Sequence, residues 1–246
     1  PLLAPLELTI GARERIAADG SIVLGLDEDK FRVDLQGLRN RGGVEALTIC
    51  FINAYINGEH ERRARDIAAE IFIDTPISIS SDVVPEMQEY ERTETTVVNS
   101  YVRPEVANYV RNMKAALEDT MGVDTQLSIL RSDGGLASAR GASESPVNLL
   151  MSGPAGGVSG AVYFCSRAGF KNILTFDMGG TSTDVALIQN SRPRVRRETI
   201  VGDVRVRAPS VDVRTVGAGG GSIAFVPALT KALRVGPESA GAVPGP

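Results

Sequence analysis

Residues 174–188 constrain the fold more than any other part of the sequence. Two apolar runs flank a pair of glycines in the order Leu-Thr-Phe-Asp-Met-Gly-Gly-Thr-Ser-Thr-Asp-Val-Ala-Leu-Ile. Apolar runs on both sides of a glycine turn predict two strands joined as a hairpin. Gly179 and Gly180 allow the chain to reverse sharply, because glycine carries no Cβ.

The turn of this predicted hairpin carries groups that suit a polyphosphate. Bare N–H groups at Gly179 and Gly180 could approach phosphate oxygens. The hydroxyl donors that follow are Thr181, Ser182 and Thr183. Asp177 and Asp184 would repel phosphate directly, so they fit this interpretation only through Mg²⁺ or a water molecule. An ordinary hairpin with turn-forming residues is the alternative. The segment is not a Walker P-loop, since it lacks Gly-Lys-Ser/Thr.

Three further glycine-rich segments leave two interpretations each. Segment 152–157 opens a helix, and it either binds an anion at free N–H groups or packs tightly on a sheet. Segment 217–222 does not match the Gly-x-Gly-x-x-Gly spacing, and it either approaches a nucleotide or only connects two elements. Segment 132–135 follows a strand, where α/β sheets bind ligands, but it also reads as a simple turn.

The remaining pattern predicts an α/β protein. An apolar run at 46–52, a helix at 59–72 and a strand at 77–80 form a strand–helix–strand unit. The polar segment 86–96 places a boundary near residues 93–100. Apolar residues at helical spacing predict a core-facing helix from Pro104 to Met121, ended by Gly122. Further predicted elements are a strand at 126–130, a helix from Ser152 with Pro154 at its first position and Gly169 after its end, a strand at 172–176, and antiparallel strands at 194–207.

Composition excludes several classes of function. The 246 residues carry a net charge of −4, so nothing favours a nucleic-acid or anionic-membrane surface. There is no run of 18 apolar residues and no secretory leader pattern, and two cysteines favour a reducing compartment, so we expect a cytoplasmic protein. His60 is the only histidine, which excludes a multi-histidine metal site, and we expect it at a solvated helix start. The arginines at 192–207 predict a solvated strand face or a subunit contact.

Taken in order, these motifs resemble the hydantoinase A / 5-oxoprolinase family. The resemblance rests on Ser-Asp-Gly-Gly, Ser-Gly-Pro-Ala-Gly-Gly-Val, Asp-Met-Gly-Gly-Thr-Ser-Thr-Asp-Val, Gly-Ala-Gly-Gly-Gly-Ser-Ile-Ala and Val-Gly-Pro-Glu-Ser-Ala-Gly-Ala. In the N-terminal half, Glu14-Arg15, Glu59-His60-Glu61, Glu89-Tyr-Glu-Arg92 and Thr95-Thr-Val-Val-Asn99 also follow the family's order. The resemblance implies the actin-like ATPase fold, an α/β fold of two RNase H-like lobes with mixed sheets and flanking helices.

The resemblance also implies domains and site residues. Residues 1–95 would be the C-terminal part of the family's N-terminal domain, and 96–246 the N-terminal part of the hydantoinase A domain, with 174–188 as the second phosphate loop. Asp177 and Asp184 would be catalytic, with Asp177 holding Mg²⁺ through water. The residues expected to bind ATP are Gly179, Gly180, Thr181, Ser182, Thr183, Gly153, Gly156, Gly157, Gly219, Gly220 and Gly221.

The implied activity is ATP-dependent hydrolysis of a hydantoin, 5-oxoproline or similar lactam, by phosphorylation of the carbonyl oxygen. A ketone carboxylase subunit and a non-catalytic scaffold lobe are the alternatives. A B-type subunit or domain is the expected partner. The family's first phosphate loop has no counterpart before residue 100, and the closing motif stops at Pro244–Pro246. We therefore expect an internal fragment that holds half of an ATP site and is inactive alone.

Overall fold

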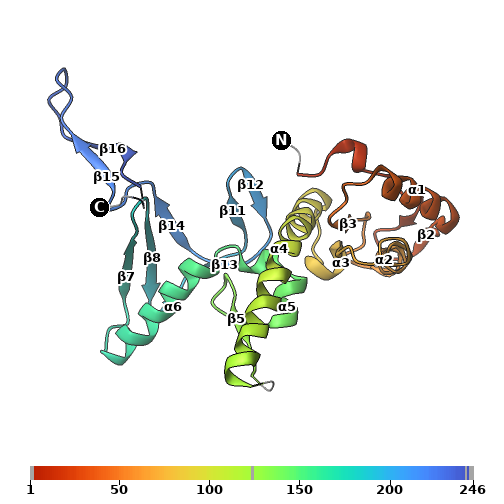
Figure 1. Ribbon diagram of the computed structural model, residues 1–246, viewed down its shortest axis with the longest axis horizontal. Helices are drawn as coiled ribbons and strands as arrows, with labels where there is room; N and C mark the ends of the chain where they lie inside the picture. The colour runs from red at the N-terminus through yellow and green to blue at the C-terminus, as the bar shows by residue number, and fades with distance from the viewer. Residues whose placement is uncertain (1–2, 123–124, 242, 244–246) are drawn as a thin grey trace. The chain divides into compact units, whose positions relative to one another are not determined.

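The computed structural model describes residues 3–122, 125–241 and 243 (Figure 1). The chain forms two compact units, each with an apolar core of its own. The first unit contains Pro1–Ile129, Leu136–Leu150 and Arg197–Ala208. The second contains Leu130–Gly135, Met151–Arg196 and Pro209–Pro246. Pro244–Pro246, the end of the closing motif, lie outside the described residues.

A strand–helix–strand motif forms the N-terminal part of the first unit. Strand β3 (Leu47–Ile49) pairs in parallel with β4 (Ile77–Ile79), and helix α2 (Glu59–Ile71) connects them. Helix α1 (Glu28–Arg41) begins where the Asp27 carboxylate accepts a hydrogen bond from the Lys30 N–H. The core between these elements consists of Phe31, Leu35, Leu38, Leu47, Ile49, Ala64, Ile67, Ala68, Phe72 and Ile79. The motif predicted from residues 46–80 is confirmed.

Helix α4 (Glu89–Met121) corrects two predictions. It begins at Glu89 rather than at Pro104, and it runs without a break through residues 93–100. Pro104 lies inside the helix, where it removes one backbone donor. The hydroxyls of Thr95 and Thr96, which are both fully buried, donate to the carbonyls of the preceding turn. Polar composition was misleading here because these side chains find their hydrogen-bond partners inside the protein.

The second half of α4 also differs from its prediction. Its apolar stripe was expected to face a core, but only Val110 is buried. Tyr109 and Met121 are 64% and 71% exposed. Helical spacing places such residues on one face but does not decide whether another element covers that face. Gly122 ends the helix at a positive φ of 100°, as predicted.

Residues 139–149 and 204–208 of the first unit pack against α4. Val98, Val147, Val206 and Ala208 form a second core cluster there. Asn99 joins the parts, since its side chain donates to the Glu144 carbonyl and accepts from the Val147 N–H. The remaining elements are η1 (Leu6–Leu8), β1 (Arg15–Ile16), β2 (Ile22–Leu24), α3 (Ser80–Val83), β5 (Ser128–Leu130), β6 (Leu136–Ser138), α5 (Ala139–Glu144), η2 (Pro146–Leu149), β11 (Thr199–Val201) and β12 (Val204–Val206).

Arg207 departs from the solvated face predicted for the arginines at 192–207. Its side chain is 11% exposed and forms ion pairs with Glu86 at 3.1 Å and Glu198 at 3.5 Å. The Arg207 N–H also donates to the Thr95 hydroxyl. The other arginines of this group are exposed, as expected: Arg192, Arg194, Arg196, Arg197 and Arg205. β11 and β12 form an antiparallel hairpin, which confirms strands in this stretch.

The second unit contains the predicted glycine hairpin. Strand β7 (Ile173–Met178) pairs antiparallel with β8 (Thr183–Gln189), and β14 (Val213–Val216) pairs with the other side of β8. Helix α6 (Ser152–Arg167) packs on one face of this sheet (Figure 1). The core between them consists of Ala155, Val158, Ala186, Ile188, Val211 and Val213. On the opposite face of the sheet, Leu174, Phe176 and Met178 are exposed.

Helix α6 and the remaining strands complete this unit. Pro154 occupies the third helical position rather than the predicted first, where its missing N–H still costs no hydrogen bond. Gly169 follows the helix end at φ +90°, as predicted. The other strands are β9 (Arg192–Pro193), β10 (Val195–Arg196), β13 (Ser210–Val211), β15 (Ser222–Phe225) and β16 (Arg234–Ser239). Among the described residues of both units, no helix is long and apolar enough to span a membrane.

Candidate functional site

Three side chains form a row across the end of the β7–β8–β14 sheet. Asp177 on β7 lies directly opposite Asp184 on β8, and Asp184 lies opposite Thr215 on β14. Residues opposite one another in antiparallel strands point to the same face, with Cβ atoms about 4.5–5.5 Å apart. The row lies on the face that α6 packs against, which Ala186 and Val213 also line. Residues seven positions apart in the sequence thus become neighbours.

The two carboxylates of this row, Asp177 and Asp184, repel each other. Like charges directly opposite in a sheet destabilise it, whereas opposite charges in such a pair stabilise it by about 0.2–1 kcal/mol. The Thr215 hydroxyl donates to Asp184 Oδ1 at 2.6 Å, and this bond orients one of the two carboxylates. Asp177 accepts no side-chain hydrogen bond from the described residues.

This donor set fits a magnesium ion better than a transition metal. Two carboxylates are hard oxygen ligands, and Mg²⁺ typically uses one or two of them together with water and substrate phosphates. No group of three or more His, Cys, Asp or Glu side chains within the described residues could hold a metal by itself. Asp177 and Asp184 therefore suit an ion that is shared with a phosphate ligand.

The turn between β7 and β8 has backbone N–H groups that could donate to a ligand. The Gly179 N–H donates to the Ser182 carbonyl at 2.9 Å, so it is not a free donor. The N–H groups of Gly180 and Thr181 have no acceptor within the described part of the chain. Thr181 is exposed. Of the expected backbone donors, these two are open to a ligand.

Thr183 and the third glycine segment use their donors within the protein. The Thr183 side chain is buried, and its hydroxyl donates to the Ala218 carbonyl at 2.6 Å. The Gly219 N–H donates to Ser222 Oγ at 3.0 Å. Gly220 and Gly221 donate to the carbonyls of Gly179 and Gly180, at 2.9 and 2.8 Å respectively. These residues lie at the turn, but their own donors are engaged.

The start of α6 lies next to the same row. A Cβ built on Gly157 would be 3.6 Å from Asp177 Oδ2, so the carboxylate lies against the first turns of the helix. A Cβ on Gly156 would approach Leu130 Cδ2 to 3.2 Å, which supports tight packing for that residue. Gly153 faces open space.

Ser132 fixes the first turn of α6 from the Ser-Asp-Gly-Gly segment. Its side chain is 1% exposed, and Oγ accepts a hydrogen bond from the Met151 N–H at 2.9 Å. Its carbonyl accepts from the Val211 N–H. Gly134 has φ +86°, and Asp133 accepts from the Gly135 N–H. The segment is a turn that supports the helix start.

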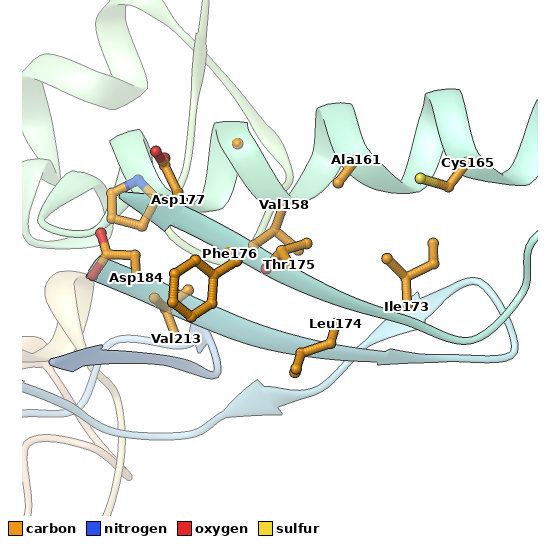
Figure 2. Close-up of a pocket in the computed structure, with 12 residues that line it drawn as sticks. Val158, Ala161, Cys165, Ile173, Leu174, Thr175, Phe176, Asp177, Asp184 and Val213 are labelled. Carbon is orange, nitrogen blue, oxygen red and sulfur yellow. The ribbon is translucent and has the colours of Figure 1, made fainter. Parts of the chain in front are cut away.

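A groove of about 340 Å³ runs between α6 and β7 (Figure 2). Asp177 and Asp184 lie at one end of it, and Cys165 lies near the other. Between them, apolar side chains such as Val158 and Ile173 line the groove. Asp177 and Asp184 therefore form the polar end of an otherwise mostly apolar groove.

His60 lies in the first unit and is not solvated as predicted. Its side chain is 7% exposed, and Nδ1 is 2.8 Å from Oε2 of Glu14, whose side chain is 5% exposed. The neighbouring Glu61 is fully buried and accepts from the N–H groups of Phe51 and Ser81. A helix start rich in charge was read as surface, but the N-terminal segment covers it.

Sequence reasoning missed Thr215 and the buried Arg92. Arg92 is fully buried and donates to Ser80 Oγ and to the carbonyls of Glu86 and Phe51. The sequence did hold one indication that Thr215 lies near the site, because its strand ends just before the glycine cluster 217–222. Its pairing with Asp184 depends on strand register, which the sequence does not display.

Comparison with known proteins identifies the family of the chain. The family model described as hydantoinase/oxoprolinase matches residues 92–246. A second model, the hydantoinase/oxoprolinase N-terminal region, matches residues 2–72. Together they span both units.

Curated relatives are about a third identical to this chain over the aligned residues. The caprolactamase subunit alpha of Pseudomonas jessenii is 35% identical over 245 residues, which are 100% of this chain and 35% of the relative. The 5-oxoprolinase of Saccharomyces cerevisiae is 36% identical over 224 residues, 89% of this chain and 17% of the relative. The chain thus spans about a third or less of the length of these relatives.

Solved structures agree with the fold described above. A nucleotide-free structure of acetone carboxylase has a TM-score of 0.80 at 32% identity, over 98% of this chain and 34% of that one. The ATP-dependent caprolactamase from Pseudomonas jessenii has a TM-score of 0.81 at 35% identity, over 96% and 34% respectively. The expected mixed α/β fold of actin-like ATPases is confirmed. The chain belongs to the hydantoinase/oxoprolinase family.

Proposed function

We propose that this chain supplies one half of an ATP site in an ATP-dependent enzyme that opens a cyclic amide. The observation that carries the proposal is the pairing of Asp177 with Asp184 beside a turn whose Gly180 and Thr181 N–H groups have no acceptor among the described residues. Carboxylates and open N–H groups rarely serve one ligand, unless that ligand combines a cation with an anion. A magnesium–polyphosphate complex is such a ligand. The family's 5-oxoprolinase and caprolactamase members support the substrate class.

Each residue would have a defined role. Gly180 and Thr181 would donate backbone hydrogen bonds to phosphate oxygens, and they need little reorganisation because the turn is already formed. Asp177 would hold the ion through water, and Asp184 would orient the attacking group or a second water. When bound, Mg²⁺ would neutralise phosphate charge during transfer. Most of the rate enhancement would come from positioning and charge neutralisation.

The proposed reaction makes an amide easier to open. The lactam carbonyl oxygen attacks the γ-phosphorus of ATP, the bond to the β-phosphate oxygen breaks, and ADP leaves. Water then adds to the activated carbon, the ring C–N bond breaks as the nitrogen takes up a proton, and an acyl phosphate remains. A second water hydrolyses this acyl phosphate to the carboxylate and inorganic phosphate. The amide is otherwise too stable to open quickly, so ATP activates its carbonyl carbon toward water.

Activation of a ketone is the second candidate. The structural match to acetone carboxylase supports it, because that protein carries out ATP-dependent acetone carboxylation. Product analysis separates the two reactions, since a lactam gives an amino acid and a ketone with bicarbonate gives a keto acid. A scaffold lobe would release no phosphate with either substrate.

The domain assignment and the partner are part of the same proposal. We assign residues 1–95 to the family's N-terminal domain and 96–246 to its hydantoinase A domain, a division by family match and not by a break in the chain, because α4 runs through it. The two family models, which match residues 2–72 and 92–246, support this division. Relatives named as subunits of caprolactamase and acetone carboxylase support a partner subunit of the B type.

Phosphate release by the full-length protein tests the proposal. Asp177→Asn and Asp184→Asn should each abolish release that depends on a lactam, while the protein still folds. Asp203→Asn is the matched control, because it makes the same change at an exposed turn in the other unit. Full activity of both site variants would overturn the proposal, as would an equal loss in the control.

A further inference from the structure

The third glycine segment, residues 217–222, was expected either to approach the nucleotide or to connect two elements. Its hydrogen bonds point to a third role. The N–H groups of Gly220 and Gly221 donate to the carbonyls of Gly179 and Gly180 in the β7–β8 turn. Segment 217–222 therefore holds the β7–β8 turn through hydrogen bonds between the two backbones.

The contact between the two segments is too close for any side chain. A Cβ on Gly219 would lie 2.6 Å from the Gly179 oxygen and 2.7 Å from the Ser182 nitrogen. A Cβ on Gly221 would lie 2.8 Å from the Gly180 oxygen. These are backbone atoms, which cannot rotate away as a flexible side chain could. Neither glycine has a positive φ, so glycine is needed there for space and not for backbone conformation.

Thr183 adds a third connection at the same place. Its buried hydroxyl donates to the Ala218 carbonyl at 2.6 Å. The turn is thus held at the carbonyls of Gly179 and Gly180 and at the first residue of β8. Its Gly180 and Thr181 N–H groups have no acceptor within the described residues.

The β15–β16 hairpin is attached to the same glycine. The Gly221 carbonyl accepts a hydrogen bond from the Ala240 N–H at 2.7 Å, just after β16 ends. A Cβ on Gly221 would also lie 2.8 Å from the Gly241 oxygen. The hairpin begins beyond the ends of β7 and β8 (Figure 1). Gly221 therefore contacts both the β7–β8 turn and the base of the β15–β16 hairpin.

We propose that Gly219 and Gly221 are positioning residues that fix the shape of the phosphate-binding turn, and that segment 217–222 is not itself a nucleotide ligand. This inference rests on the proposed function, because it assumes a polyphosphate at the turn. A side chain at either glycine would push the turn away by several tenths of an ångström. Misplacement of about 1 Å in a reacting system can reduce the rate about 100-fold.

The test compares alanine at three glycines of one loop in the full-length protein. Gly217→Ala is the matched control, because a Cβ there has nothing within 4 Å. We expect Gly219→Ala and Gly221→Ala to weaken ATP–Mg²⁺ binding by on the order of 10-fold to 100-fold, and the control to bind normally. In hydrogen exchange without nucleotide, the first two should speed exchange at residues 178–184. Normal binding and exchange in both would overturn the inference.

A second pair of variants adds no bulk. Thr183→Val removes the hydrogen bond to Ala218 while keeping the shape of the side chain, and Thr183→Ser retains the hydroxyl. We expect faster exchange in the turn for Thr183→Val and normal exchange for Thr183→Ser. If the glycine variants do not fold, the two Thr183 variants test whether segment 217–222 holds the turn. Equal exchange in Thr183→Val and Thr183→Ser would overturn the inference. Normal phosphate release in Asp177→Asn and Asp184→Asn would reject the ATP site separately, because the exchange measurement needs no nucleotide.

Discussion

Thr215 and Asp184 form a hydrogen bond of 2.6 Å across neighbouring strands, with the hydroxyl donating to Asp184 Oδ1. Asp177 lies on the other side of Asp184 in register and has no such partner among the described residues. The bond fixes one carboxylate and leaves the other free to respond to a cation. Two acidic residues at corresponding positions of a hairpin thus have different surroundings.

The first prediction concerns this hydrogen bond. Thr215→Val keeps the shape of the side chain but removes the donor, so the Asp184 carboxylate loses its fixed orientation. We expect kcat for phosphate release to fall about tenfold, equivalent to about 1.4 kcal/mol, with KM for ATP little changed. Thr215→Ser should restore the rate. A Thr215→Val enzyme as fast as the unmodified protein would contradict the prediction.

The second prediction separates stability from activity at Asp177. Asp177→Asn removes one of two like charges placed opposite each other, so the sheet should become more stable when no magnesium is present, by roughly the 0.2–1 kcal/mol that a cross-strand pair contributes. Activity should be lost in the same variant. Thermal unfolding without and with Mg²⁺ measures the first effect, and phosphate release measures the second. A lower melting temperature without Mg²⁺ would be inconsistent with repulsion between the carboxylates.

The third prediction concerns the buried pair of His60 and Glu14. His60→Ala leaves the Glu14 carboxylate buried without its partner, which should destabilise the first unit by about 1–3 kcal/mol. The double variant His60→Ala/Glu14→Ala should lose less than the sum of the two single variants, because contacting residues are not additive. Urea unfolding of the four proteins measures the coupling. Strict additivity would mean that the pair contributes nothing.

The fourth prediction is a pH dependence of the contact between α1 and α2. A hydrogen bond from Arg63 lowers the pKa of Glu28, and one from Arg32 lowers the pKa of Glu70, from their ordinary value of 4.5. Because the folded pKa values are lower, the stabilisation is present above about pH 4.5 and is lost as the pH falls through the folded values. The effect should be small, since all four groups are exposed to solvent.

Hydrogen exchange in the peptides of α1 and α2 measures this effect between pH 3 and 7, after correction for the intrinsic dependence on pH. Protection should decline at the acidic end in the unmodified protein. In Glu28→Gln/Glu70→Gln it should already be lower at neutral pH and should change less with acid. Glu45→Gln, at an exposed position, is the control. An unchanged acid response in the double variant would contradict the assignment.

Much of the local structure was readable from the sequence, because it depends on neighbouring residues. Apolar runs on both sides of Gly179 and Gly180 predicted β7 and β8, and Gly122 and Gly169 marked helix ends through their need for positive φ. The strand–helix–strand motif at 46–80 followed in the same way. These features need only the local chain.

Predictions failed where burial was inferred from polarity. The segment around Thr95 and Thr96 was read as a boundary, and His60 as a surface residue, yet all three are buried. Tyr109, expected in a core, is exposed. A polar side chain can be buried when its partners are supplied, and those partners come from distant segments such as Glu14.

The sequence by itself determined the family, the α/β class and the acidic hairpin with its glycine turn, because these depend on residue order and local conformation. Only the tertiary structure decided that Thr215 orients Asp184 and that Gly219 and Gly221 hold the turn from behind. Strand register and backbone contact across about 40 residues set these relationships. Composition does not encode them, since the same glycines suit a flexible loop equally well.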